Sequence, residues 1–543
     1  MGVLTEMRSS ASGATSAINF DAMPRLGDIP RYHAARTPAA IAMTFEGADL
    51  DWAMLDARTD RVANALLGAG IVPGDRVVFL GKGTDEFFEL LFGTARAGAV
   101  LVPVQWRLAL PEILQIVGDA EPALIVLGAD QVDRCAEICA HLGDCPPLIV
   151  MEQGAPGHRC YADWRDAAPA GAPGIDVDPG AVALQLYTSG TTGLPKGVML
   201  SHRNILSGRR DAMAEPMPWN EWLEGDVNLT ALPVGHVGGV GWALVGFFNG
   251  ARTIVQRDFV PAQVLDAIEH GGVTKMFFVP TALQLLLMQP RVREIDYSRL
   301  RYVLYGASPI ALDLLREATQ VFGCGFAQQY GMTETCGTIV YLPPEDHDPA
   351  GTPRMRAAGL PMPGVELRIV DVDTRTLLPA HAVGEVETRS VANMVGYWKR
   401  PDATAETVDA QGWLRTGDAG YLDDDGYLYI HDRFKDMICT GAENVYPAEV
   451  ESAIYGHPAV QEVAVVGVPD AQWGESVKAV VVLRPGASAT AEEILSFSRT
   501  RVAGFKVPRT IDFIDALPRN AAGKVLRRVL REPYWVGYDR RVN

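Results

Sequence analysis

Residues 187–204 read YTSGTTGLPKGVMLSHRN, and between Thr188 and Val198 this stretch holds three glycines, four Thr or Ser hydroxyls and a lysine. The flanking segments AVALQLY and GVML are aliphatic and β-branched, so we expect two strands joined by a glycine-rich loop. Glycine-spaced amides can form a nest that binds anions, to which hydroxyls and a lysine add donors and charge. Taken alone, the stretch fits a phosphate loop and a plain hairpin turn equally well.

The stretch does not follow the commonest phosphate-loop pattern. That pattern, G-x-x-x-x-G-K-[ST], requires a glycine before the lysine and a hydroxyl after it, at the start of a helix. Here Pro195 precedes Lys196 and Gly197 follows it, and proline has no N–H to donate. A P-loop NTPase is therefore disfavoured.

The composition is that of a folded globular protein. The chain has 543 residues, 48% of them hydrophobic and 21% charged, enough for three or four folding units. Its net charge of −18 disfavours a nucleic-acid partner. The N-terminus lacks the pattern of a secretion signal, and seven cysteines without a C-x-x-C pair indicate reduced thiols in the cytoplasm. The apolar run from Phe87 to Trp106 contains Glu89 and Arg96, so we expect a core helix and a strand and no stable membrane insertion.

The order of apolar runs and helical patterns predicts the domain organisation. Short apolar runs such as RVVFL, ALIVLG and RYVLYG alternate with amphipathic helical segments, which indicates layered parallel α/β structure. After about residue 435 the segments become short strands and short helices, typical of a compact α+β domain. We therefore predict an α/β fold with a large N-terminal domain of layered α/β subdomains, residues 1–434, and a small mobile α+β domain, residues 435–543.

Further motifs follow the glycine loop in order along the chain. They are ALPVGHVGG from 231, YGASPI from 305, QQYGMTET from 328, VGYWKRPDATAET from 395, GWLRTGD from 412, IHDRFKDMICTGAENVYPAEVE from 430 and LPRNAAGKVLRR from 517. Together with YTSGTTGLPKGV, this series resembles the signature of the adenylate-forming acyl-CoA synthetase superfamily, which also contains luciferases and the adenylation domains of peptide synthetases. The resemblance runs from about Phe45 to Arg531, and the joint occurrence of these motifs is highly specific.

The resemblance implies a two-step reaction, in which a carboxylate attacks the α-phosphate of ATP and the thiol of coenzyme A then displaces AMP. Two anions must meet in the first step, so Mg²⁺ and lysines are needed between them. By resemblance, Glu334 binds the metal, and Lys524 of the small domain promotes the attack. The small domain then rotates about a hinge at Lys435.

The resemblance also places the remaining site residues. The phosphates are expected to contact Thr188, Ser189, Gly190, Thr191, Thr192, Gly193, Lys196 and Thr333. The adenine and ribose are expected to contact Gln329, Tyr330, Gly331, Asp418 and Arg433. The thiol channel passes Gly441, next to Ala442 where many relatives have a second glycine. The acyl pocket is assigned to His236, Gly238, Gly239, Gly306, Ala307 and Met332.

The sequence narrows the class of the acid substrate but does not identify the acid. The PVGHVGGVGW segment has no aspartate to hold a substrate ammonium, so an amino acid is disfavoured, and its glycines leave room for a fatty or aryl acid. Those glycines could instead serve close packing of the backbone. We interpret His236 as a pocket wall or gate, because a carboxylate has no proton to remove at neutral pH.

Three functions stay open at this point. The favoured one is a carboxylate:CoA ligase of fatty acid metabolism or aromatic acid degradation, which acts on a medium- to long-chain fatty acid or an aryl-type acid. Its partners are the acid, ATP and CoA. The second is an acyl-AMP-forming or luciferase-like enzyme without CoA ligation. The third is a non-catalytic nucleotide-binding protein. Whether the chain forms a homodimer is left open.

Overall fold

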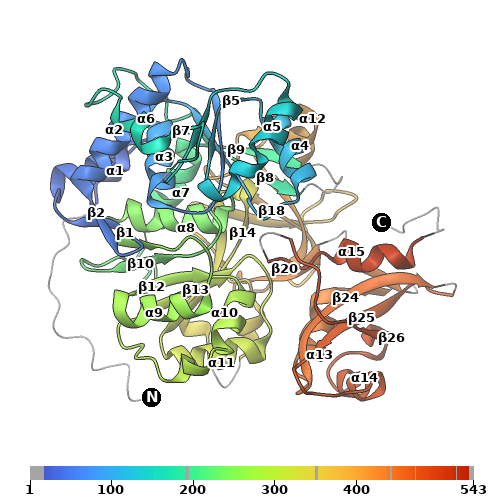
Figure 1. Cartoon of the computed structure of the whole chain (residues 1–543). Helices are drawn as coiled ribbons and strands as arrows, with labels where there is room; N and C mark the ends of the chain where they lie inside the picture. The colour runs from blue at the N-terminus through green and yellow to red at the C-terminus, as the bar shows by residue number, and fades with distance from the viewer. Residues whose placement is uncertain are drawn as a thin grey trace.

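The computed structural model describes residues 18–152, 154–189, 195–213, 215–348, 352–433, 436–440, 443–470, 472–520 and 523–536. Most of these residues form two large sheets, a third small antiparallel sheet and a separate C-terminal α+β unit (Figure 1). Among the described residues, no helix combines the length and the apolar character that a membrane crossing requires.

The first large sheet carries the glycine-rich hairpin at one end. Its strand order is β19-β9-β8-β4-β3-β5-β6-β7. The bounds are β3 (Arg76–Leu80), β4 (Val100–Val104), β5 (Pro122–Leu127), β6 (Leu148–Val150), β7 (Arg159–Cys160), β8 (Val182–Ser189), β9 (Pro195–Ser201) and β19 (Gly396–Tyr397). The strands from β8 to β7 are parallel, as the sequence predicted, whereas β9 and β19 join them in antiparallel pairs.

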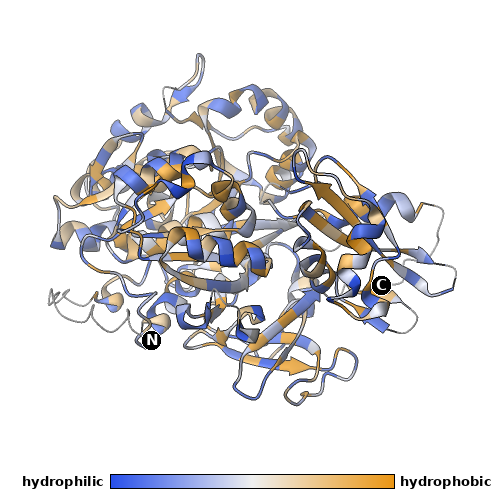
Figure 2. Cartoon of the chain, turned by 90° about the horizontal axis from the view of Figure 1, so that it is seen from below, coloured by the Kyte–Doolittle hydropathy of each residue, from blue (hydrophilic) through white to orange (hydrophobic). Residues whose placement is uncertain are grey.

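Helices cover both faces of this sheet and the edges around it. They are α1 (Asp28–Arg36), α2 (Trp52–Gly68), α3 (Asp85–Arg96), α4 (Leu110–Ala120), α5 (Cys135–Leu142), α6 (Tyr161–Asp166) and α7 (His202–Ala212). Hydrophobic and hydrophilic residues alternate along the outer helices, which places one face of each helix in the core (Figure 2).

The prediction that the apolar run from Phe87 contains a core helix is confirmed. The helix α3 begins where Thr84 accepts a hydrogen bond from the N–H of Phe87 and so caps the first turn. The buried charge of Glu89 on this helix is paired: its carboxylate lies 2.8 Å from Arg58 and 2.7 Å from Arg165. A buried charge is tolerated when it is paired in this way.

The second large sheet supplies the floor of the candidate site. Its order is β16-β15-β14-β13-β12-β10-β11-β1-β2, and the strands from β14 to β1 are parallel. The bounds are β1 (Ile41–Phe45), β2 (Ala48–Asp51), β10 (Val227–Thr230), β11 (Arg252–Val255), β12 (Lys275–Phe278), β13 (Tyr302–Gly306), β14 (Gly325–Met332), β15 (Gly337–Leu342) and β16 (Leu360–Pro361). The helices that pack beside it are α8 (Val237–Phe248), α9 (Pro261–Gly271), α10 (Pro280–Leu287) and α11 (Leu312–Phe322).

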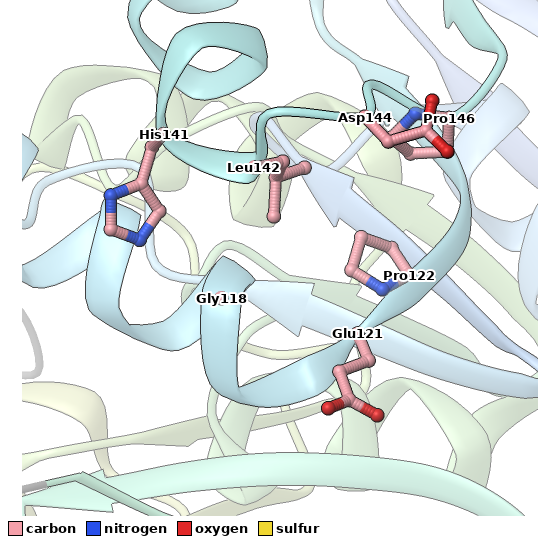
Figure 3. Close-up of a pocket in the computed structure, with 7 residues that line it drawn as sticks. All are labelled: Gly118, Glu121, Pro122, His141, Leu142, Asp144 and Pro146. Atoms are coloured by element: carbon pink, nitrogen blue, oxygen red, sulfur yellow. The ribbon is translucent and has the colours of Figure 1, made fainter.

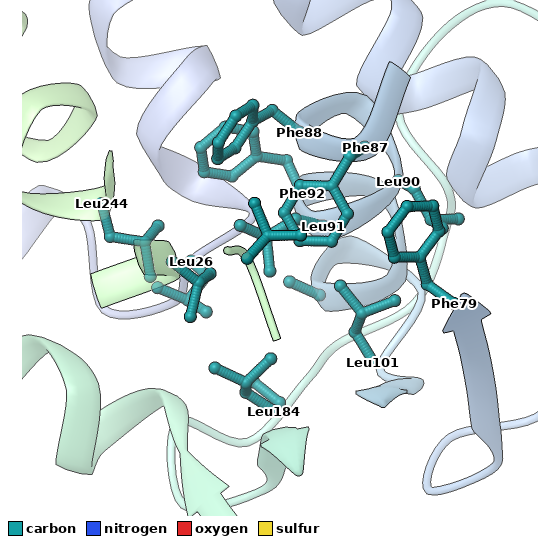
Figure 4. Close-up of a cluster of buried hydrophobic side chains, with 14 of the residues drawn as sticks. Leu26, Phe79, Phe87, Phe88, Leu90, Leu91, Phe92, Leu101, Leu184 and Leu244 are labelled. Carbon is teal, nitrogen blue, oxygen red and sulfur yellow. The ribbon is translucent and has the colours of Figure 1, made fainter. Parts of the chain in front are cut away.

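The helix α8 lies between the two large sheets, which explains why the segment VGGVGWALVGFF has almost no polar residue. Leu244 and Phe247 of α8 belong to the same buried cluster as the phenylalanines of α3, and Figure 4 shows this cluster. Trp242, on another side of α8, packs with Phe277 of β12 instead. A helix that is apolar on all sides must be buried on all sides, and the two sheets provide the cover.

A third sheet connects this core to the C-terminal unit. It is antiparallel, with the order β17-β18-β20-β21, and its bounds are β17 (Glu366–Val370), β18 (Gly384–Arg389), β20 (Leu414–Leu422) and β21 (Leu428–Arg433). The segment DDDG, Asp423 to Gly426, lies in the turn between β20 and β21. The short helix α12 (Pro401–Thr407) precedes β20.

The C-terminal unit has its own sheet and its own core, which confirms the predicted small α+β fold (Figure 1). Its strands are β22 (Ile438–Thr440), β23 (Glu443–Val445), β24 (Val460–Asp470), β25 (Gly474–Leu483) and β26 (Thr510–Phe513), and its helices are α13 (Pro447–Tyr455), α14 (Ala491–Arg499) and α15 (Arg527–Arg531). The predicted domain boundary falls at residues 434 and 435, outside the described residues, and stays a prediction.

Candidate active site

The strands β8 and β9 flank the glycine-rich stretch and pair antiparallel, which confirms the two predicted strands. In the register of this pair Thr188 lies opposite Lys196, and Ser189 lies opposite Pro195. The ammonium of Lys196 lies over the ring of Tyr397, 4.9 Å from its centroid. The predicted phosphate contacts of Gly190, Thr191, Thr192 and Gly193 fall outside the described residues, as does the side chain of Ser189.

The predicted metal ligand Glu334 is buried in the turn that joins β14 to β15. Its Oε1 accepts a 2.9 Å hydrogen bond from the hydroxyl of Tyr397, and its carbonyl accepts a 2.8 Å bond from the N–H of Met394. Thr333, the predicted phosphate contact, begins the same turn. Tyr397 therefore touches both predicted charged groups, Glu334 through its hydroxyl and Lys196 through its ring.

The motif VGYWKRPDATAET from 395 contains Tyr397, but the sequence suggested no role for this residue. The short strand β19 positions this residue because Tyr397 pairs with Val198 of β9, directly after the hairpin tip. The carboxylate of Glu334 suits a hard divalent cation. A carboxylate has room for about four hydrogen-bond donors or ligands, so the bond from Tyr397 leaves capacity for Mg²⁺. The donor set thus fits the metal that the sequence predicted.

The predicted ribose and adenine contacts lie together on neighbouring elements. The hydroxyl of Tyr330, on β14, donates a 2.6 Å hydrogen bond to Oδ2 of Asp418, on β20. Arg433 is the backbone partner of Asp418 in the β20–β21 pair, although its side chain lies outside the described part of the protein. Gln329, next to Tyr330, accepts a 3.1 Å bond from Thr338 on its Oε1. The pairing of Tyr330 with Asp418 was not foreseen from the sequence.

Two of the predicted site glycines are required by the close approach of backbones. A Cβ atom on Gly331 would lie 1.8 Å from the carbonyl oxygen of Gly337, and one on Gly306 would lie 2.1 Å from that of Gln329. Ala307 follows with φ of +68°, a conformation that costs energy in a residue other than glycine. These residues let β13, β14 and the turn after β14 come together beside the site.

The glycine run at the start of α8 has two different roles. A Cβ on Gly239 would lie 2.1 Å from the carbonyl oxygen of Pro233, so this glycine serves close packing, the alternative left open by the sequence. A Cβ on Gly238 would meet only Cε1 of Phe277, at 3.3 Å. The ring of Phe277 therefore lies close to Gly238, and an added methyl group would be in tight contact with it. Met332, also assigned to the pocket, is half-buried at the end of β14.

His236 caps the N-terminus of α8 and is neutral at physiological pH. Burial, together with the smaller effect of the nearby charge of Arg107, lowers the pKa of its imidazole to about 4. Its Nε2 atom is buried and has no hydrogen-bond partner among the described residues. A neutral ring facing the predicted pocket is compatible with a wall or gate.

The predicted adenylation lysine, Lys524, is exposed on a loop of the C-terminal unit. Asn520 closes this loop: its side chain accepts a 2.9 Å bond from the N–H of Lys524, and its N–H donates a 2.8 Å bond to the carbonyl of Lys524. Lys435 and Gly441, predicted as the hinge and the thiol channel, lie outside the described residues.

Arg519 connects the loop of Lys524 to the large domain, a role that the sequence did not suggest. Its Nη1 donates a 2.7 Å bond to the carbonyl of Gly523 and a 3.3 Å bond to Oγ1 of Thr281, at the start of α10. Its Nη2 lies 3.0 Å from the carboxylate of Glu462 on β24. The loop that carries Lys524 is therefore held against the carboxyl end of β12.

A surface cavity of about 370 Å³ lies away from these residues, between α4 and α5. Figure 3 shows its lining, which is Gly118, Glu121, Pro122, His141, Leu142, Asp144 and Pro146. None of them is a predicted site residue. In the loop beside it, Cys139 and Cys145 form a disulfide with an S–S distance of 2.08 Å, so the expectation of reduced thiols was wrong for this pair. The turn after α5 brings the two Cα atoms within 4.7 Å, which the spacing of six residues did not reveal.

Comparison with known proteins assigns the family. A family model described as "AMP-binding enzyme" matches residues 31–398, and one described as "AMP-binding enzyme C-terminal domain" matches residues 449–524. The chain belongs to the AMP-binding enzyme family. Its membership confirms the predicted superfamily and the predicted class, an AMP-forming acid–CoA ligase that uses ATP, Mg²⁺ and CoA.

Similar proteins cover almost the whole chain. A fatty acid–[acyl-carrier-protein] ligase from Streptomyces coeruleorubidus is 43% identical over 518 residues, which are 94% of this chain and 97% of that protein. A feruloyl-CoA synthase from an Amycolatopsis species is 36% identical over 511 residues, 94% of this chain and 99% of that one. The crystal structure of ATP-bound MatB from Rhodopseudomonas palustris superposes with a TM-score of 0.84 at 34% identity, covering 94% and 99% of the two chains. The overall fold prediction is thereby confirmed, whereas the homodimer and the cytoplasmic location stay predictions.

Proposed function

We propose that this AMP-binding enzyme joins an apolar carboxylic acid, fatty or aryl, to the thiol of coenzyme A through an acyl-adenylate. The observation that carries the proposal is the convergence of Lys196, Glu334 and Tyr397 at the base of the hairpin. A cation and a metal-binding carboxylate in contact with one side chain are what a polyphosphate requires. The pair of Tyr330 and Asp418 supports a nucleoside site beside them.

In the first step an oxygen of the substrate carboxylate attacks the α-phosphorus of ATP. A bond forms between these atoms, and the bond to the bridging oxygen breaks, so pyrophosphate leaves. In our proposal Lys196, Thr188 and the hairpin tip hold the β- and γ-phosphates, and Thr333 holds the α-phosphate. When bound at Glu334, Mg²⁺ supplies positive charge to the phosphates. Lys524 donates to the attacking carboxylate and the α-phosphate, and so reduces the repulsion between the two anions.

The nucleoside is held by the elements next to the phosphates. Asp418 offers two acceptor oxygens to the ribose hydroxyls, with Arg433 as a second contact. The hydroxyl of Tyr330 fixes the orientation of the Asp418 carboxylate, and its ring is left to stack on the adenine. Gln329 and Gly331 complete the adenine site in this proposal.

In the second step the thiol sulfur attacks the acyl carbon, and the bond from that carbon to the AMP oxygen breaks. In our proposal the C-terminal domain, residues 435–543, rotates for this step, so that Lys524 leaves the reacting groups and the thiol can enter. Lys435 at the boundary with residues 1–434 would act as the hinge, and Gly441 would let the pantetheine arm approach the backbone.

The pocket residues favour an acid with a compact apolar body. Gly238 faces Phe277, and the ring of Phe277 packs against Trp242 with the centroids 6.1 Å apart. In our proposal this aromatic pair forms the wall of the pocket behind His236 and Gly238, which would favour a flat ring or a short to medium chain over a long one. Gly239, Gly306, Ala307 and Met332 shape the rest of the pocket.

The acceptor has one serious alternative. The fatty acid–[acyl-carrier-protein] ligase that is 43% identical to this chain is named for transfer to a carrier protein. The phosphopantetheine thiol of a carrier protein and that of CoA are chemically the same group. The carrier protein is therefore the second candidate acceptor.

A single assay tests both proposals. The purified enzyme is mixed with Mg-ATP, a panel of fatty and aryl acids, and either CoA or a phosphopantetheinylated carrier protein. We expect AMP, pyrophosphate and acyl-CoA. Thioester formation on the carrier protein alone would replace CoA by the second candidate. Accumulation of acyl-AMP without any thioester would refute ligation.

A further inference from the structure

Arg209 places a guanidinium inside the large domain without a carboxylate to neutralise it. This residue lies on α7, and its Nη2 donates a 2.7 Å hydrogen bond to the carbonyl of Gly241 on α8. Its Nε atom is buried and has no partner among the described residues. Within the part of the chain that the structure describes, no carboxylate oxygen lies within 4.0 Å of it.

The surroundings of Arg209 disfavour its charged form. Burial lowers the pKa of its guanidinium to about 10, and the thiol of Cys336 is the single nearby group that raises it. Its neighbour Arg210 differs: that side chain is exposed and lies 3.5 Å from the carboxylate of Asp211. An unpaired buried charge is strongly unfavourable, and proteins usually keep one for a function.

Arg209 lies next to the predicted acyl pocket. Gly241 is five residues after His236 on α8, which corresponds to a rise of roughly 7.5 Å along the helix. A Cβ on Gly241 would lie 3.9 Å from Nη2 of Arg209 and 3.6 Å from Cγ2 of Val237. Val237 stands between the pocket residues His236 and Gly238, so the guanidinium lies one turn deeper along the same helix.

The opposite wall of this space is the turn that carries Glu334. Cγ2 of Val237 lies 3.8 Å from the Cβ position of Gly337, and Gly337 follows Cys336. Val237, Cys336, Gly337 and Arg209 each keep some exposed surface as whole residues, although the Nε atom of the Arg209 guanidinium is buried. A substrate body that reached this region would lie among them.

We propose that Arg209 binds an acceptor oxygen on the body of the acid substrate, remote from the carboxylate that is adenylated. The proposal rests on the proposed function and narrows its substrate class to acids with a second carboxylate, a carbonyl or a phenolic oxygen. The planar guanidinium can direct two N–H groups at such an oxygen or carboxylate, which a lysine cannot do. The bond from Nη2 to Gly241 holds the plane in place. Arg209 lies about one helical turn beyond His236 along α8. A second oxygen on the far side of one aromatic ring, or at the end of a short chain, would lie at about this distance from the carboxylate.

Matched pairs of acids test this proposal. The pairs differ only in the second oxygen, for example cinnamate with 4-hydroxycinnamate, and octanoate with octanedioate. The first variant, Arg209→Met, keeps a long side chain but removes the charge. The second, Arg209→Lys, keeps the charge but removes the planar guanidinium that can donate two N–H groups. Arg210→Met is the control, since it removes an exposed arginine from the same helix. Adenylation is measured as pyrophosphate release, and the thermal unfolding of each variant is recorded.

For the wild type we expect kcat/KM to favour the oxygenated member of at least one pair by about tenfold or more. Arg209→Met should remove this preference while unsubstituted acids are still activated, Arg209→Lys should keep part of it, and Arg210→Met should keep all of it. A preference that survives Arg209→Met within twofold, or a wild type that favours the unsubstituted acids throughout, would overturn the proposal. Failure to activate any acid would refute the proposed function instead. If Arg209→Met does not fold, Gly241→Ala, whose methyl group would stand near the guanidinium, must shift the same ratio.

Discussion

The loop that carries Lys524 should depend on Arg519 in one half-reaction only. Arg519 binds the carbonyl of Gly523 at 2.7 Å and Thr281 of the large domain at 3.3 Å, so it holds Lys524 towards the site while the C-terminal domain is in the described position. We predict that Arg519→Ala slows formation of the acyl-adenylate. It should leave thioester formation from supplied acyl-AMP nearly unchanged, because that step uses the rotated domain.

The size of the effect follows from the bonds that are lost. A hydrogen bond from a charged donor contributes about 1.5–3 kcal/mol. The bond to Gly523 is short and positions the loop, whereas the bond to Thr281 is long and should contribute less. A loss of about 1.5–3 kcal/mol in the first transition state corresponds to a decrease of roughly 10- to 100-fold in rate. Thr281→Val, which removes only the bond between domains, should cost about two- to fivefold on the same scale.

The two half-reactions can be measured separately. Adenylation is followed by exchange of labelled pyrophosphate into ATP, and thioester formation is followed with purified acyl-AMP and CoA. Arg528→Ala removes an exposed arginine of α15 and serves as the matched control, and Lys524→Ala should abolish the exchange. Arg519→Lys should restore part of the activity, since it retains the charge near Glu462. Equal loss in both half-reactions, or no loss in either, would refute the positioning role.

Other side chains give three further predictions. Tyr397→Phe removes the hydroxyl that donates to Glu334, so the KM for Mg-ATP should rise about tenfold. Pyrophosphate exchange at varied Mg²⁺ concentration measures this KM. An unchanged KM would show that the bond from Tyr397 to Glu334 does not support binding of Mg-ATP. Phe277→Ala should move the preferred acid towards longer or bulkier members, measured as kcat/KM across a chain-length series, and an unaltered ranking would show that Phe277 is not the pocket wall. Burial raises the pKa of Glu86 to about 7 from an ordinary 4.5. The folded protein then binds a proton that the unfolded chain releases, so the free energy of unfolding should fall as the pH rises from 4.5 to 7. This decrease in the free energy of unfolding is at most about 3 kcal/mol, and it should be absent in Glu86→Gln. Urea denaturation of both proteins at pH 5 and pH 8 measures it. An unchanged pH dependence in the variant would contradict the raised pKa of Glu86.

Local patterns in the sequence were sufficient for much of the fold. The β8–β9 hairpin, the core helix α3 and the turn between β20 and β21 each follow from residues within one short segment, where periodicity and turn chemistry act directly. The buried charges of α3 also show the limit of such patterns. Glu89 belongs to α3, but its partner Arg165 lies 76 residues further along the chain.

For the candidate site too, the sequence indicated some features and the structure was needed for others. The motifs identified Glu334, Asp418 and Lys524 as residues of interest through their resemblance to a known family, without locating them in space. The contacts that organise them join residues far apart in sequence: Glu334 and Tyr397 are 63 residues apart, and Tyr330 and Asp418 are 88 apart. No local signal encodes such a pair, because it depends on which strands become neighbours in the sheets.

The sequence by itself determined the enzyme family, the two-part architecture and the pattern of glycines, hydroxyls and a lysine between β8 and β9, since these depend on residue types in a fixed order. Only the tertiary structure decided which groups support that chemistry. Packing α7 against α8 leaves Arg209 without a carboxylate partner among the described residues, and packing the C-terminal unit against α10 brings Arg519 to Thr281, 238 residues away in the chain. Burial and long-range contact create these properties, and both exist only after the chain has folded.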